Sequence, residues 1–238
     1  LLENFVQGCS RMLGPFVAGV LLASTGPIGC ISLMAALSGA ALLSVRQLSK
    51  QQIPRENMRP LVSPWTVLGQ SLRYVGSNQS ILGVILITMV LNLLMLPYMT
   101  LLPIFARDVL GQGPVGLGLL STASGIGSFM GLFMTNFLRR YLSLGWILTG
   151  GTFGMAVALL IFSQSSIYQL SWAMLLITGM GQACFGIMQS SIILLTASDE
   201  MRGQTMGVLV LAIGSDPVGK LITGGIAEDF GAPQSVGM

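Results

Sequence analysis

Three ionisable residues lie inside long apolar runs of this sequence, and they are the residues best placed to do chemistry. Arg11 falls in the first run, and Asp216 and Lys220 fall in the last. If the runs cross a membrane, each charge costs about 2.5 to 3.5 kcal/mol on insertion scales, so it should face a partner or a cavity. Asp216 and Lys220 are one helical turn apart and can neutralise each other. Asp216 then either takes up and releases a proton or belongs to a pair that only allows the helix to insert.

Arg11 also has two interpretations. It either makes a helix-packing or gating contact, or it extends its side chain to lipid headgroups at the membrane surface. The sequence alone leaves both open.

Neutral polar side chains inside the runs form a second set of candidates. Asn92 lies in the third run, and Gln182 and Gln189 lie in the sixth. Tyr98 stands between two prolines that interrupt the third run, and interrupted helices near a cavity free backbone carbonyls. We therefore take these four residues as cavity-lining candidates, with hydrogen bonding to a neighbouring helix as the alternative.

Small residues cluster on the fourth run. Such surfaces let membrane helices approach closely, so we assign this one to helix contact rather than to chemistry. The residues are Ser121, Ser124, Gly125, Gly127, Ser128 and Gly131.

The sequence lacks the residues of most catalytic and metal sites. It has no histidine, and its three cysteines stand singly without a CxxC pair. An aspartyl dyad would need a second acid deep in a run beside Asp216, and no serine or cysteine has a base nearby. The net charge of +3 comes mainly from cations between the runs, which we assign to membrane orientation rather than to nucleic-acid binding. We therefore expect no enzyme, no metal, no cofactor and no nucleic-acid partner.

The runs that carry these residues are long enough to cross a membrane as helices. The 238 residues are 53% hydrophobic and 8% charged, with a mean hydropathy of +0.80, whereas soluble domains carry about 25% charged residues. A helix needs about 20 apolar residues to span a bilayer, and the alternation of a transmembrane barrel strand is absent from runs such as ILGVILITMVLNLLML. The sequence therefore predicts an all-α membrane protein with seven spans: Phe5–Ser24, Ile28–Val45, Ile81–Phe105, Val115–Leu138, Leu144–Phe162, Ile167–Thr196 and Met206–Ile226.

Cations between the predicted spans indicate an orientation. If the amino end is cytoplasmic, eight of them lie in cytoplasmic connections and only Arg107 lies on the other side, as the positive-inside rule requires. The segment 46–79 is the longest connection and is predicted to be a cytoplasmic linker. Ser63 and Pro64 suit a helix start there, and Trp65, Leu68, Leu72 and Val75 follow at helical spacing. They predict a short amphipathic helix, unless this stretch simply continues the third span.

Two segments resemble the major facilitator superfamily. The stretch SRMLGPFVAG is similar to the glycine-proline motif of the fifth helix in its antiporters, matched by Gly14, Pro15 and Gly19, with Ser10 and Ala18 where the fuller motif has glycine. The stretch from Asp199 to Pro233 resembles the tenth-to-eleventh helix region of bacterial efflux and siderophore-export members. The matching residues are Glu200, Arg202, Gly203, Pro217 and Gly219.

Two features depart from the family's pattern. Lys220 stands where relatives have a small residue, and Asn136 stands where the signature between helices eight and nine has an acid.

The resemblance implies helices five to eleven of a twelve-helix bundle. Residues 1–45 would be the last two helices of the amino-terminal half, 46–79 the linker, and 80–238 the first five helices of the carboxy-terminal half. It further implies a monomeric secondary transporter of the cytoplasmic (inner) membrane. Such a protein exports a small molecule, drug-like or siderophore, by proton antiport with alternating access. The alternative is a non-transporting membrane sensor or scaffold.

Overall fold

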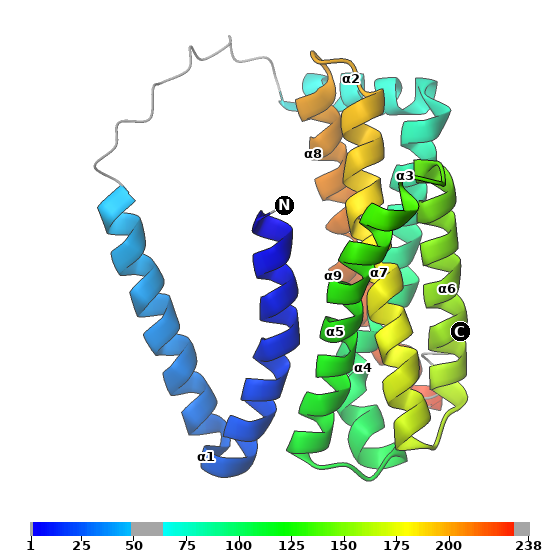
Figure 1. Ribbon diagram of the computed structural model, residues 1–238. Helices are drawn as coiled ribbons and strands as arrows, with labels where there is room; N and C mark the ends of the chain where they lie inside the picture. Colours follow the sequence, from blue (N-terminus) through cyan, green and yellow to red (C-terminus); the bar gives the residue numbers. More distant parts are fainter. Residues whose placement is uncertain (1, 49–63, 231–238) are drawn as a thin grey trace.

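The computed structural model describes residues 2–48 and 64–230 of the chain. Within these residues the fold contains helices and no strand, which confirms the predicted all-α class (Figure 1). The elements are α1 (Leu2–Leu48), α2 (Pro64–Ser77), α3 (Gln79–Val90), the π-helical turn η1 (Leu91–Met95), α4 (Tyr98–Ile104), the π-helical turn η2 (Phe105–Val109), α5 (Pro114–Leu138), α6 (Leu144–Gln164), α7 (Tyr168–Thr196), α8 (Arg202–Ile213) and α9 (Asp216–Phe230).

Six helical segments in the described part of the chain are long and apolar enough to cross a membrane, one fewer than predicted. They are Ser24–Ser44, Gln79–Val109, Pro114–Leu138, Leu144–Gln164, Tyr168–Thr196 and Arg202–Gly225. The first predicted run, Phe5–Ser24, is helical within α1 but is not one of the six. Most of its side chains lie outside the described part of the structure. The described residues therefore show six spans, where the sequence predicted seven.

A single glycine folds α1 back on itself. Gly26 has φ 68° and ψ −166°, a conformation that residues with a Cβ rarely adopt. The thiol of Cys30, after the bend, lies 3.7 Å from the carbonyl oxygen of Ala18, before it. Helix α1 packs along α5, and Figure 1 shows that the arm before Gly26 is the nearer one.

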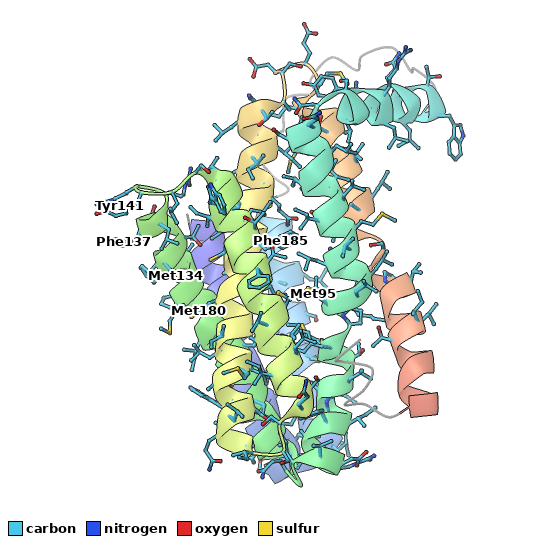
Figure 2. The ribbon with its side chains drawn as sticks, turned by 90° about the vertical axis from the view of Figure 1, so that its right-hand side faces the viewer. Met95, Met134, Phe137, Tyr141, Met180 and Phe185 are labelled. Carbon is cyan, nitrogen blue, oxygen red and sulfur yellow. The ribbon has the colours of Figure 1, made fainter. Side chains whose placement is uncertain are left out.

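Helix α2 is a separate element and does not continue the third span. The Asn78 side chain caps α3 by accepting hydrogen bonds from the backbone N–H groups of Ser80 at 3.1 Å and Ile81 at 3.4 Å. The chain therefore turns at Asn78, and α2 lies across the ends of the spanning helices (Figure 2). Its inner face buries Ser71 and Val75 against the bundle.

Close packing of α5 against α7 forms the centre of the bundle. A Cβ built at Gly131 would lie 2.6 Å from the Met180 carbonyl oxygen, and Gly127 approaches the α7 backbone in the same way. The Ser128 hydroxyl donates a hydrogen bond to the Gly179 carbonyl at 3.2 Å. The small-residue surface predicted on the fourth run is therefore a helix contact at Gly127, Ser128 and Gly131.

The outside of the bundle is apolar. Large side chains such as Phe137 and Trp146 are 60% and 73% exposed, and Figure 2 shows Phe137 and Tyr141 at the outer edge, whereas Met95 and Phe185 lie within. A water-facing surface would not tolerate this pattern, but lipid covers it without cost.

Candidate functional site

The third span loses regular hydrogen bonding at η1. The Leu96 N–H donates to the Leu91 carbonyl at 2.9 Å, five residues back, instead of to Asn92. Pro97 has no N–H to donate to Leu93. The carbonyls of Asn92 and Leu93 therefore lack the donors that a continuous α-helix would supply.

The last span is divided between α8 and α9, whereas the sequence predicted one run with a bend at Pro217. Because Pro217 has no N–H, it cannot donate to the Ile213 carbonyl, and α8 ends there. The Ser215 carbonyl then accepts from Val218 at 3.1 Å and Gly219 at 3.2 Å, which starts α9. Asp216 is thus the first residue of a helix, where the helix dipole favours a carboxylate.

Gly219 brings α9 against the interrupted part of the third span. A Cβ built at this residue would lie 2.5 Å from the Leu93 carbonyl oxygen and 2.7 Å from that of Asn92. Only glycine permits this approach without displacement of the backbone. The two helix breaks, which are far apart in the sequence, therefore meet in space.

Asp216 and Lys220 form an ion pair at this meeting point. The Lys220 Nζ lies 2.7 Å from the Asp216 Oδ2, and the two side chains are 44% and 28% exposed respectively. The pair is intrahelical, at the one-turn spacing noted in the sequence.

A groove of about 520 Å³ runs past the ion pair. Its lining comes from η1, α4, α7 and the junction of α8 with α9. The lining residues are Asn92, Leu96, Met99, Thr100, Gln182, Ile213, Gly214, Asp216, Pro217 and Lys220.

A second cavity, of about 330 Å³, adjoins the groove. Met99 and Gln182 line both, so the two spaces meet at these side chains. The remaining lining residues are Tyr98, Leu102, Ser121, Ser124 and Gly125. The last three belong to the small-residue surface of the fourth run, which is thus partly cavity wall and not wholly helix contact.

The groove presents several hydrogen-bonding groups. The Asn92 side-chain nitrogen donates to the Thr88 carbonyl at 2.8 Å, which leaves its oxygen as acceptor. The Thr100 hydroxyl donates to the Pro97 carbonyl at 2.6 Å. The Gln182 Oε1 is buried and has no hydrogen-bond partner within the described residues. Among the described residues that line the groove, Lys220 is the only cation.

Other candidate residues lie elsewhere. Gln189 is buried, and its Oε1 accepts a hydrogen bond from the Thr88 hydroxyl at 3.0 Å, so it joins α7 to α3. A Cβ added at Gly14 would meet no atom within 4 Å. Arg11, Pro15 and Gly19 lie on the first arm of α1, but their side chains and surroundings are outside the described part of the structure. No cluster that could hold a metal ion occurs among the described residues.

Met99 and Thr100 line the groove, although the sequence reasoning did not single them out. A signal for them exists. Both residues follow Pro97 and Tyr98 in the sequence, so they lie on the first turn of α4, directly after the helix break.

Comparisons with known proteins agree with this architecture. A family model described as transmembrane secretion effector, a group within the major facilitator superfamily, matches residues 2–237. A solved bacterial homolog of the human lysosomal transporter Spinster, inward-facing and unoccupied, matches with a TM-score of 0.62 and 16% identity. The match covers 94% of this chain and 53% of that one, so the chain spans about half the length of its structural neighbour. A comparison with curated proteins finds no significant match.

Proposed function

Because the chain belongs to the transmembrane secretion effector family of the major facilitator superfamily, we propose that it works as part of a secondary transporter that exports a small molecule by proton antiport. It is a multi-pass membrane protein. We place it in the cytoplasmic membrane, with the amino end and the 46–79 segment on the cytoplasmic side. We propose a monomer without cofactor, catalytic step or nucleic-acid partner, whose contacts are substrate, protons and lipid.

The charged groove at the junction of α8 and α9 carries this proposal. A carboxylate and an ammonium in a spanning segment are costly unless they are paired or used. Broken helices that meet at such a site are typical of transporters, where the two breaks allow one bundle to rock against another. Asp216 is the acid we assign to proton exchange, with Lys220 as its counter-charge.

The glycine and proline residues of the two family motifs would support the movement of helices during transport. We propose that Gly14, Pro15 and Gly19 on α1, and Pro217 and Gly219 on α9, allow the close helix contacts that shift during transport. Arg11 would make a packing or gating contact on the first arm of α1. Asn92, Tyr98 and Gln182 would line the substrate path.

The test is flux across a sealed membrane. The full-length protein is reconstituted into vesicles that contain a pH-sensitive dye, and ethidium and a catecholate siderophore are added in turn under an imposed pH gradient. Substrate-dependent proton movement that is absent from protein-free vesicles supports antiport. Substrate flux without proton movement contradicts the coupling, and no flux of any tested compound contradicts export and favours the sensor or scaffold.

A further inference from the structure

We propose that a groove on the outside of the bundle, between α3 and α6, binds one anionic phospholipid of the adjoining membrane leaflet. This lateral groove has a volume of about 330 Å³ and is lined from residues 79–87 of α3, 144–149 of α6 and 192–196 of α7. It shares no lining residue with the groove beside Asp216. Lipid binding there does not depend on the proposed transport function.

The packing of three helices creates the lateral groove. Helices α3 and α6 both pack against α7 but have little contact with each other, so α7 forms the floor between them. Figure 2 looks onto this side of the bundle, where α3 and α6 lie side by side. A Cβ built at Gly83 on α3, or at Gly145 on α6, would meet no atom within 4 Å. The two glycines therefore leave the space between the walls open.

The lining of the lateral groove changes from polar to apolar along the bundle. Gln79 begins α3 and Thr196 ends α7, so these polar side chains lie at the end of the bundle where α2 lies. Ile87 is eight residues further along α3, about 12 Å into the bundle. The Thr149 hydroxyl donates to the Gly145 carbonyl at 2.9 Å and is thus satisfied within its own helix. The apolar lining residues are Val84, Ile87, Leu148 and Ile192.

A phospholipid in the adjoining leaflet has the same polarity in the same direction. Its headgroup lies at the level of the helix ends, and its acyl chains point toward the middle of the membrane. The lateral groove also opens onto the apolar exterior that lipid covers. A lipid molecule therefore fits both ends of the groove without leaving its leaflet.

Aromatic side chains mark the level of the headgroups beside the polar end. Tyr141 and Trp146 lie on either side of the first residue of α6, and each is 73% exposed. Tyrosine and tryptophan gather where the hydrocarbon of a membrane meets water, because their rings are amphipathic. The polar end of the lateral groove is therefore at the depth of lipid headgroups.

Exposed arginines flank the polar end on both sides. Arg73 lies on α2, six residues before Gln79, and Arg139 and Arg140 lie just before the start of α6. None of the three arginines forms an ion pair within the described residues. Basic groups beside a groove between membrane helices attract anionic headgroups.

Two acids lie in the turn after α7, close to Thr196 in the sequence. Asp199 is paired with Arg202 at 2.8 Å, so this pair adds no net charge. Glu200 then stands against the three flanking arginines. The excess of positive charge favours an anionic phospholipid such as phosphatidylglycerol over a zwitterionic one.

Photolabelling with two lipids tests the proposal. Phosphatidylglycerol and phosphatidylcholine, each with a diazirine in one acyl chain, are added to the full-length protein in phosphatidylcholine vesicles. Mass spectrometry then locates the labelled residues. We expect the phosphatidylglycerol probe to label residues 84–87, 148–149 and 192 about fivefold more than the other probe, the preference that one nearby arginine provides. Unlabelled phosphatidylglycerol should compete.

Filling the lateral groove should remove this labelling. Gly83→Phe and Gly145→Phe each place a ring in the space, and each should lower labelling there about tenfold, as when two methylene groups of the lipid lose their contact. Gly154→Phe is the matched control. Gly154 lies nine residues after Gly145, on the opposite face of α6, and a Cβ there also meets no atom within 4 Å. This variant should label as the unchanged protein does.

A charge variant separates headgroup recognition from folding. Arg139→Gln combined with Arg140→Gln should remove most of the preference for phosphatidylglycerol and leave labelling by the phosphatidylcholine probe as it was. Phe133 on α5 is 59% exposed and reports general contact with lipid. Its labelling should be equal in all variants, which shows that the bundle remains folded.

Three results would overturn the proposal. Equal labelling of the lateral groove by both probes, without competition by unlabelled phosphatidylglycerol, would make it an ordinary lipid-facing surface. Labelling that survives both phenylalanine variants would place the lipid elsewhere. Disulfide formation between Thr149→Cys side chains of two protein molecules, with loss of labelling, would show that a second copy occupies the groove.

Discussion

Asp216 combines features that sequence inspection treats separately. It is charged within a spanning segment, it begins a helix, and it lines the same groove as Asn92, which lies at the break of the third span. Each feature alone has a structural explanation. Together they are the observations from which we propose that Asp216 exchanges the proton.

Replacement of Asp216 by Asn should abolish proton-driven flux and leave substrate exchange without a gradient largely intact. The amide keeps the shape of the side chain but does not titrate. Counterflow and gradient-driven flux in the same vesicles measure the two activities. Proton-driven flux that survives in the double variant Asp216→Asn with Lys220→Met would show that the pair serves only insertion.

Gly219 provides a test of the contact between the two helix breaks. Gly219→Ala should destabilise the protein by about 1 to 3 kcal/mol, because the new Cβ would overlap two backbone carbonyls. Gly224→Ala, on the same helix, meets no atom within 4 Å and should be neutral or slightly stabilising, as alanine is the better helix former. Thermal unfolding in detergent measures both. Equal melting temperatures for the two variants would contradict the close approach.

At the scale of elements, α2 is attached to the turn between α7 and α8. The Ser198 N–H donates to the Tyr74 hydroxyl at 3.0 Å, and hydrogen bonds with the Ser198 side chain and backbone lower the pKa of Tyr74. The Ser71 hydroxyl donates to Gln204 Oε1, on α8, at 3.1 Å. Helix α8 ends just before Asp216. These hydrogen bonds therefore connect α2 to the candidate site through α8.

Tyr74→Phe should loosen α2 from this turn. The loss of the hydroxyl removes a hydrogen bond worth about 1 kcal/mol, so opening of α2 should become roughly fivefold more frequent. Hydrogen exchange of the amides of α2 measures this. Ser77→Ala is the matched control, because the Ser77 hydroxyl donates within α2, to the Tyr74 carbonyl, and not to the turn. Equal exchange in the two variants would show that Tyr74 does not hold α2.

At the scale of the whole molecule, an apolar exterior surrounds a bundle whose charges lie mostly at its ends. Large aromatic side chains such as Phe137 and Phe153 are exposed on this exterior, which is expected of a surface that contacts lipid and not of one that faces water. The orientation that we propose rests on the distribution of cations, which cluster on the side of α2 and the turn between α5 and α6.

Single cysteines in an otherwise cysteine-free protein should report that orientation. Arg139→Cys, in the exposed turn after α5, should react with a membrane-impermeant thiol reagent only from the cytoplasmic side. Gln112→Cys, between η2 and α5, should react only from outside. The predicted cytoplasmic position 55 and external position 234 lie outside the described residues and can be labelled in the same way. Reversed reactivity would invert the assigned topology.

The sequence determined those properties that depend on neighbouring residues. Composition and run length predicted the helical membrane class, because a bilayer demands apolar spans with internal hydrogen bonding. Pro97 and Pro217 marked two helix interruptions, since proline removes a hydrogen-bond donor. Pro103, which was also predicted to interrupt the third run, lies within α4 instead. The four-residue spacing of Asp216 and Lys220 predicted that they could pair.

The tertiary structure decided which side chains share the site. Gln182 and Gln189 are seven residues apart, about 10 Å along α7 and on nearly the same face, so periodicity cannot separate them. Thr88 lies opposite Gln189 and bonds it, whereas open space lies opposite Gln182. The meeting of Gly219 with the carbonyls of η1 likewise joins segments about 125 residues apart in the sequence. Such pairings depend on how whole helices pack, and no local pattern encodes them.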